Sequence, residues 1–401
     1  MVRPPAARVV VTNLSEILRR AERSGDAAEL RTWLEERRAF AGVADGTAEI
    51  AWAYATSAIA RAMPFMVETL SADEWWATLD ELRQVATDAR ALTLEERPLL
   101  AQLLAGELPL TLATRFPEIA ACAADRGAAF AVLARGFDEL LDGEGTPHQR
   151  HWAIQRPLAA CWTRCGVLSD EPFPLADYGV SAEQFPDVVR ETRRARANDS
   201  QVLLSTQAPD DASGFAAFLA VAERLADDVR RRMKKLKRKT PKPKPEPQDD
   251  EQDEKQDLNG PSKHAEWSQL AVFRTQDDPR APTLAMMYAG QAQKIELGVA
   301  GDVLISGDWT WELAVDGRIL EAASEWTEAC HIGDQDVDYL ELELDLEQGW
   351  KIERRIVLGR KDRFALLADA ISGPHGAESF NVSHPAGADR RRDRRRHGRD
   401  A

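Results

Sequence analysis

The spacing of hydrophobic residues changes once along this chain. Before the proline-rich stretch near residue 240, apolar residues recur about every 3.6 positions, and after Glu266 they alternate with polar residues. The first pattern predicts helices that bury one face, and the second predicts strands with one face on a core. The sequence therefore predicts an α+β multidomain protein, with an α-helical N-terminal half followed by an antiparallel β-sandwich in the C-terminal half.

The first half contains repeated helix signals. Leu30 and Leu34 lie on one face of a predicted helix over residues 26–40, and Ser71 followed by Glu74 is a capping-box pattern that predicts a helix start. Further helices are predicted over residues 47–61, 99–115, 118–141, 149–166, 181–196 and 214–236. Because short turns separate many of them, we expect helical hairpins or an incomplete α/α toroid.

The second half contains consecutive strand signals. Residues 339–346 alternate apolar and acidic side chains, as expected of a strand between a core and water. Strands are predicted over residues 267–274, 281–289, 292–299, 302–306, 308–315, 326–332, 337–346, 350–359 and 362–371. Tight turns between successive strands indicate antiparallel meanders rather than βαβ units.

A charged, proline-rich segment separates the halves. Residues 230–239 are rich in Arg and Lys without an acid, alternating prolines follow over 241–247, and an acidic run occupies 249–257. Alternating prolines favour extended chain, and blocks of charge stay solvated. The basic run has the composition of a nucleic-acid arm, but the adjacent acidic run favours a linker. The predicted domains are a helical domain over 1–229, a disordered linker over 230–264, a β-sandwich over 265–372 and a disordered Arg-rich tail over 373–401.

The tail has two interpretations. Residues 390–399 contain seven arginines and no hydrophobic period, which suits a basic arm that binds an anion. The alternative is GC-rich coding sequence read out of frame, and it is favoured because the strand pattern stops abruptly after Ile371. In that case the strand over 362–371 is an uncovered sheet edge.

Net charge and composition limit the partners. The formal net charge is −15 and the pI is about 5.1, so we expect neither nucleic acid nor an anionic membrane surface as a partner. An anionic polysaccharide would need a local basic cluster. The chain has four cysteines, which predicts free thiols in a reducing compartment. Without a signal-peptide core or an apolar run of about 18 residues, we expect a cytoplasmic protein.

Few residues have the spacing of a known catalytic or metal site. His148 and His151 could share a helix face, but further metal ligands are not evident nearby. Cys161 and Cys165 are typical of buried thiols on a helix. Cys330 and His331 point to opposite faces of a strand and cannot form a nucleophile–base pair. No metal or cofactor is predicted, and there is no glycine-rich phosphate loop or nucleophile elbow.

A segment over residues 141–151 contains an Asp142-Gly143 turn that leads into a helix with His148, and Arg156 follows. Here the chain resembles bacterial heparinase II/III-type proteins, in which an Asp-Gly turn and a histidine precede a toroid helix and a β-sandwich follows. Residues 194–204 look like the next turn of that family. Residues 353–358 and 364–369 are similar to its paired strands, an Arg pattern that ends in an Asp. The resemblance covers about residues 95–371.

This resemblance implies β-elimination at a uronic acid. Such an enzyme neutralises the sugar carboxylate, removes the C5 proton with a base and protonates the leaving O4 with an acid. A histidine or asparagine with an arginine suits the first task, and a tyrosine or histidine suits proton transfer. The candidates are His148, Arg156 and Tyr178, which lie close together in the sequence, and His331 as a contribution from the β half. The implied partner is an acidic polysaccharide or oligosaccharide. The alternative is a non-catalytic cytoplasmic scaffold, whose helical surface binds a protein and whose β module recognises carbohydrate.

Overall fold

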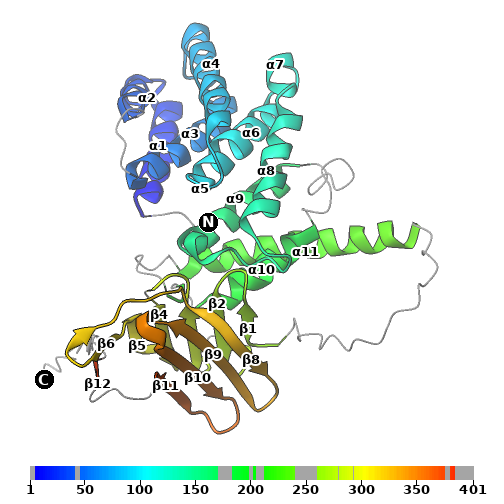
Figure 1. The fold of residues 1–401 in the computed structure, drawn as a ribbon. Helices are drawn as coiled ribbons and strands as arrows, with labels where there is room; N and C mark the ends of the chain where they lie inside the picture. Colours follow the sequence, from blue (N-terminus) through cyan, green and yellow to red (C-terminus); the bar gives the residue numbers. More distant parts are fainter. Residues whose placement is uncertain are drawn as a thin grey trace, which may run out of the picture. The chain divides into compact units, whose positions relative to one another are not determined.

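The chain divides into two units, and each unit consists of two separate stretches of the sequence. The computed structural model describes residues 5–40, 46–169, 183–197, 202–204, 212–239, 260–278, 280–291, 293–374 and 380–383. The helical unit comprises Met1–Arg193 and Gln207–Pro247, and the β unit comprises Arg194–Thr206 and Gln248–Ala401 (Figure 1). This arrangement confirms the predicted fold class, an α-helical half followed by antiparallel strands.

Short turns join many of the helices in the described part of the helical unit. Its helices are α1 (Pro5–Ser24), α2 (Ala28–Phe40), α3 (Gly46–Ala62), η1 (Met63–Met66), α4 (Ala72–Asp88), η2 (Ala89–Ala91), α5 (Pro98–Leu100), η3 (Ala101–Glu107), α6 (Leu108–Arg115), α7 (Ala120–Ala123), α8 (Arg126–Leu140), η4 (Gln149–Ile154), α9 (Gln155–Leu168), α10 (Phe185–Arg194) and α11 (Ala212–Lys239). Their apolar faces form one core that includes Leu30, Leu103, Phe137 and Trp162. No helix in the described part of the chain is both long and apolar enough to cross a membrane.

The start of α4 shows how the sequence sets a helix boundary. The backbone N–H of Glu74 donates to the Ser71 hydroxyl at 3.4 Å, and the Glu74 carboxylate accepts from the Ser71 backbone N–H at 2.8 Å. This reciprocal capping box is the one predicted from the sequence, and it satisfies two N–H groups that a helix start leaves without partners.

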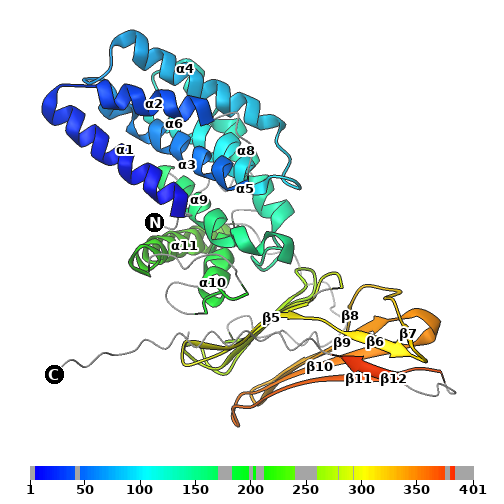
Figure 2. The same ribbon diagram turned by 90° about the vertical axis from the view of Figure 1, so that its left-hand side faces the viewer.

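The β unit consists of three antiparallel sheets. Its strands are β1 (Lys263–Ala265), β2 (Leu270–Arg274), β3 (Thr283–Met287), β4 (Gln293–Val299), β5 (Asp302–Trp309), β6 (Glu312–Val315), β7 (Arg318–Ile319), β8 (Thr327–Gly333), β9 (Val337–Asp345), β10 (Lys351–Gly359), β11 (Ala365–Ser372) and β12 (Phe380–Ser383). The sheet orders are β1-β2-β3-β4-β5, β11-β10-β9-β8 and β12-β6-β7. Phe273 and Leu284 of the first sheet share a core with Leu340 and Ile352 of the second. The five-stranded and four-stranded sheets therefore lie face to face, as Figure 2 shows.

The basic run over 230–239 is helical, contrary to its assignment to the linker. It forms the end of α11, which continues to Lys239. Arg and Lys are good helix formers, and positive charge is favourable at a helix C-terminus. Arg230 and Arg231 also pair with Asp227 and Asp228 three residues earlier. The prolines and acids of the predicted linker lie outside the described residues.

Two further boundaries differ from the sequence prediction. Residues 194–206 belong to the β unit, although the sequence places them in the helical domain. The predicted disordered tail contains β12, which pairs with β6. Within the described strands, β11 is an outer strand of its sheet, as expected for the strand over 362–371. The Arg-rich end of the tail lies outside the described residues.

Candidate functional site

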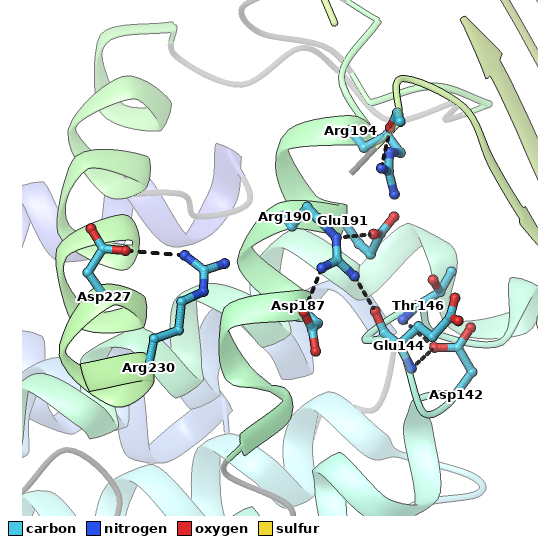
Figure 3. Close-up of polar contacts among 10 residues, drawn as sticks. Asp142, Glu144, Thr146, Asp187, Arg190, Glu191, Arg194, Asp227 and Arg230 are labelled. Atoms are coloured by element: carbon cyan, nitrogen blue, oxygen red, sulfur yellow. Dashed lines mark hydrogen bonds and ion pairs between the residues drawn. The ribbon is translucent and has the colours of Figure 1, made fainter. Parts of the chain in front are cut away.

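The Asp-Gly turn of the sequence motif is held against the start of α10. Oδ1 of Asp142 accepts from the backbone N–H groups of Glu144 at 2.9 Å and Thr146 at 2.8 Å (Figure 3). Gly145 has φ +85°, and a Cβ on it would lie 2.5 Å from the backbone N of Val188. Glycine is therefore required by both the positive φ and the close approach of the two backbones.

Arg190 of α10 connects the turn to its own helix. Its guanidinium donates to Asp187 at 2.7 Å, to Glu191 at 3.0 Å and to the backbone carbonyl of Glu144 at 3.4 Å (Figure 3). Arg190 and Glu191 are largely buried, with side-chain exposures of 17% and 4%. These contacts fix the position of α10 relative to the turn.

A pocket of about 440 Å³ lies beside this turn in the helical unit. Its lining residues come from the turn, the start of α10 and the last part of α11: Gly143, Glu183, Gln184, Pro186, Asp187, Val229, Arg230, Met233 and Lys234. This volume is within the range of small-molecule sites in proteins. The lining combines two cations, two carboxylates and an amide, with apolar side chains between them.

The charged groups of the pocket differ in how firmly they are held. Arg230 pairs with Asp227 at 3.2 Å, but both side chains are about half exposed or more, at 49% and 63%. Such a pair is weak and can be replaced by a ligand carboxylate. Burial raises the pKa of Asp187, although Arg190 and Arg230 oppose this change. Oε1 of Gln184 is buried and has no hydrogen-bond partner among the described residues. The pocket thus offers cations for an anion and acceptors for hydroxyl groups.

His148 precedes η4 and caps it. Its Nδ1 accepts from the backbone N–H of Arg150 at 3.3 Å, which places the proton of the neutral ring on Nε2. Burial and the nearby Arg150 lower the pKa of His148. The neighbouring His151 accepts from Nε of Arg150 at 3.1 Å, and burial, Arg150 and His148 lower its pKa to about 4. Both imidazoles are therefore neutral near pH 7.

Arg156 lies in the core of the helical unit. Its side chain is buried, at 2% exposure for the residue, and its guanidinium lies 4.0 Å from the ring centroid of Phe215. This geometry is a cation–π contact between α9 and α11. Tyr178 lies outside the described residues.

His331 lies on β8 in a cluster of ionisable side chains. Its ring stacks on His264 with centroids 4.2 Å apart. Nε2 of His264 is 3.0 Å from Oε2 of Glu328 and 3.1 Å from the hydroxyl of Tyr288. Burial and the nearby His264 lower the pKa of His331 to about 4, although Glu328 opposes this. Burial and Glu328 raise the pKa of Tyr288, so the phenol is neutral.

The contacts given above do not join the three candidate residues that the structure describes, His148, Arg156 and His331. His148 and Arg156 lie in the helical unit and His331 in the β unit.

Sequence reasoning also missed several of the residues described above. Arg230 and Lys234 lie within the predicted helix over 214–236, but the predicted linker boundary at residue 230 excludes them from the helical domain; they lie one turn apart on α11. Asp187 is not among the predicted site residues; it lies in the first turn of α10, which begins four residues later than the predicted helix. Glu328 faces His264 at a register irregularity between Glu328 and Cys330, which strand periodicity does not reveal.

A separate group of metal-ligand side chains lies in the helical core. Ligand atoms of Glu107, Cys161 and Cys165 are all within 4.8 Å of one another, and all three residues are buried. However, the Glu107 carboxylate accepts from Arg164 at 2.7 and 2.6 Å and also pairs with Arg61. Two guanidinium groups oppose a further cation, and burial raises the pKa of the Cys161 thiol. The group fits an internal ion pair better than a metal site.

Comparisons with known proteins agree on the fold. No protein-family description matches the sequence, and no curated protein matches it. Among solved structures, a heparinase III with methylated lysines matches with a TM-score of 0.58 and 11% identity, over 90% of this chain and 62% of the other. A second heparinase III structure gives a TM-score of 0.56 with 11% identity, over 89% of this chain and 61% of the other.

The heparan sulfate lyase HepC from Pedobacter heparinus also matches, with a TM-score of 0.52 and 14% identity, over 90% of this chain and 61% of HepC. This chain thus spans about three fifths of the length of the solved structures that it matches. At such low identity the likeness concerns the fold. On this evidence the chain has the fold of the heparinase III-type polysaccharide lyases and is a distant structural relative of them.

Proposed function

We propose that this protein binds an acidic saccharide in the pocket beside the Asp142–Thr146 turn. The observation that carries the proposal is the lining of that pocket, where Arg230 and Lys234 of α11 lie with Gln184 and Asp187 at the start of α10. A uronate carboxylate would pair with the two cations, and sugar hydroxyl groups would donate to the amide and carboxylate oxygens. The heparinase III-type fold supports the same class of ligand.

The cations of the pocket can bind an anionic ligand although the chain as a whole is acidic. The net charge of −15 repels polyanions at long range. The last part of α11 is rich in Arg and Lys, and the two cations of the pocket, Arg230 and Lys234, come from it. Because repulsion between separated charges is screened by salt, short-range pairing decides binding at physiological ionic strength.

We further propose β-elimination as the reaction of the bound saccharide. A base takes the C5 proton, the C4–O4 bond breaks with its electron pair on O4, and a proton is delivered to O4, leaving a C4–C5 double bond. His148 is a candidate because its ring is neutral near pH 7 and accepts or donates protons. Tyr178 remains a candidate acid from the sequence. The burial of Arg156 favours a structural role, and we do not include it in substrate contact.

Binding is tested by calorimetry with size-defined oligosaccharides of heparan sulfate, hyaluronan, alginate and polygalacturonate. Arg230→Ala should weaken binding of the preferred oligosaccharide roughly tenfold or more, since charge-assisted hydrogen bonds contribute about 1.5–3 kcal/mol. Arg231→Ala is the matched control, because Arg231 also pairs three residues back, with Asp228, but does not line the pocket. Equal losses in both variants, or no binding by the folded protein, would contradict the proposal.

Cleavage is tested separately by the ultraviolet absorbance of the unsaturated uronate product. Saccharide binding without this signal identifies a carbohydrate-binding protein rather than a lyase. A signal that is lost in His148→Gln, with binding retained, supports proton transfer by His148.

A second candidate is the scaffold function, favoured by exposed apolar side chains on the helical unit. Phe65 and Val67, at and just after η1, are 73% and 59% exposed, and Trp76 at the start of α4 is 50% exposed. Isolated exposed apolar residues are common, but three within twelve positions indicate a surface suited to a protein partner. Retained saccharide binding in Phe65→Ser and Trp76→Ser variants would show that the two surfaces are independent.

A further inference from the structure

A short segment of the β unit is fixed to the five-stranded sheet by two hydrogen bonds. The segment, residues 195–204, closes on itself through the backbone N–H of Leu203 and the carbonyl of Ala195, 2.9 Å apart. Nη2 of Arg274 donates to the carbonyl of Arg196 at 2.6 Å. The backbone N–H of Leu204 donates to Oε2 of Glu296 at 2.9 Å. We call the described residues of this segment, 195–197 and 202–204, the strap.

The strap covers the sheet face that points away from the sandwich core. Phe273 and Leu284 are core residues of neighbouring strands. Side chains alternate along a strand, so Arg274 and Thr283 point to the opposite face. Glu296 is paired with Ala285, two residues along β3 from Thr283, and therefore shares that outer face. The outer face is nevertheless dry at this point, with Arg274 and Glu296 each 2% exposed.

Glu296 is a buried carboxylate without a counter-charge among the described residues. One oxygen accepts from Leu204, and the other, Oε1, has no polar partner there. Burial raises the pKa of this carboxyl, and the bond from Leu204 opposes the increase. An isolated ionised carboxylate in a dry site is strongly unfavourable, so buried charges are normally paired or bind ions.

A small cavity lies directly at this carboxylate. It measures about 10 Å³, which is close to the minimum that holds one water molecule or one ion. It is lined by Ala197, Leu203, Ala281, Thr283, Glu296, Gly298, Gly301, Asp302 and Val303. The strap, the sheet and the β4–β5 turn thus line a cavity that holds one water molecule or one ion beside the Glu296 carboxylate.

We propose that this cavity is a binding site for one monovalent cation of the size of Na⁺. A hard cation prefers carboxylate and carbonyl oxygens, and Glu296 supplies a buried carboxylate to the cavity. The second carboxylate of the lining, Asp302, is exposed. One buried carboxylate balances one positive charge, whereas Ca²⁺ takes six to eight oxygens and is usually held by several carboxylates. The cavity is too small for an organic ligand.

The ion would also stabilise the strap. Leu204 has φ +59°, a backbone conformation that is unfavourable for a residue with a side chain. Its N–H group is bound by the same carboxylate that would hold the ion, so ion binding keeps Glu296 ionised and its hydrogen bond charge-assisted. The cation would therefore be a structural ion that attaches the strap to the sheet.

The test compares thermal unfolding of the full chain in NaCl and in choline chloride at equal ionic strength. With Na⁺ at several times its dissociation constant, the unfolding temperature of the unsubstituted protein should be roughly 2–4 °C higher in NaCl. Glu296→Gln should lose this difference. Glu312→Gln is the control, because Glu312 is an exposed glutamate on another strand of the same unit, and it should keep the full difference.

A second measurement does not depend on a stable variant. Crystals of the unsubstituted protein soaked in Tl⁺, which replaces monovalent cations, should show an anomalous peak at the cavity. Equal stability in the two salts with no such peak overturns the proposal. So does Ca²⁺-specific stabilisation, or a Glu296→Gln variant that is more stable in both salts, which would show that Glu296 is normally protonated.

Discussion

Arg354 and Asp369 form a two-fold hydrogen-bonded ion pair in the interior of the β unit. They face each other across β10 and β11, and each of the two N–O distances is 2.7 Å. The Arg354 guanidinium also donates to Oε1 of Gln293 and to the carbonyl of Trp309, and it lies 3.9 Å from the ring centroid of Trp309. A buried guanidinium with this many partners defines the register of the two strands.

Removal of one partner of this pair should be strongly destabilising. Asp369→Ala leaves the Arg354 charge buried without its carboxylate, and we expect a loss of about 3–5 kcal/mol in the free energy of unfolding. The measurement is guanidinium chloride unfolding followed by circular dichroism. Arg355→Ala is the control, because Arg355 is 47% exposed in its pairs with Glu341 and Glu353, and it should change stability little. Similar losses in the free energy of unfolding in both variants would show that the buried pair contributes no more to stability than the exposed pairs of Arg355.

The turn beside the pocket allows a direct comparison of two glycines. Gly145→Ala should destabilise the helical unit by more than 1 kcal/mol, because its positive φ and its approach to Val188 exclude a side chain. Gly143→Ala should be tolerated, since no atom lies within 4 Å of the added Cβ. Urea unfolding midpoints of the two variants give the comparison. Equal midpoints would mean that the turn adapts to a side chain.

The capping box of α4 should contribute measurably to stability. Ser71→Ala removes the side-chain acceptor for the Glu74 N–H and should cost about 1 kcal/mol. Hydrogen bonds from Arg31 and Ser71 lower the pKa of Glu74 to about 2. Because the pKa of Glu74 is depressed in the folded state, the ionised Glu74 carboxylate stabilises the fold above the pKa it has in the unfolded chain. This stabilisation is lost as the pH falls towards 2. The difference in unfolding midpoint between Ser71→Ala and the unsubstituted protein should therefore shrink on acidification from pH 5 to pH 2.

His331 should make the stability of the β unit depend on pH. Its pKa is about 4 in the folded protein and close to 6.5 in an unfolded chain. Between these values the unfolded state binds more protons, so stability falls as pH decreases from about 6.5 to 4. His331→Gln should flatten this part of the stability profile. A proton NMR titration of the His331 ring gives an independent value, and a midpoint near 6.5 would contradict the argument.

Much of the fold could be predicted from the spacing of apolar side chains along the sequence and from local capping patterns. The capping box at Ser71 and the strands around Tyr339–Leu346 and Ile352–Leu358 follow from local patterns, and the structure places them as expected. The paired strands of the family resemblance are β10 and β11, with Arg354 opposite Asp369. These features depend on neighbours within a few residues or on an adjacent strand.

The remaining features depend on contacts between distant parts of the chain. Residues 194–206 have a helical period at their start, yet they belong to the β unit because Arg274 and Glu296 bind their backbone. The basic run gives two conflicting signals, since its helix propensity extends the predicted helix to residue 236 whereas its charge density indicates a solvated linker from residue 230. Pairing of Arg230 and Arg231 with Asp227 and Asp228 favours the helix. The pocket could not be predicted, since its lining joins residues more than 80 positions apart.

The assignment of the strap to the β unit means that the chain passes from one unit to the other three times, near residues 193, 206 and 247. A protease that cleaves only the proline-rich connection would give two polypeptides, and the sheet would then be held to the N-terminal one by the hydrogen bonds of the strap rather than by a peptide bond. A gene fragment that begins at residue 265 would encode a sheet whose Glu296 and Arg274 are uncovered. An isolated β unit for biophysical work should accordingly be made by grafting residues 194–206 onto it, as a circular permutant or as an added peptide.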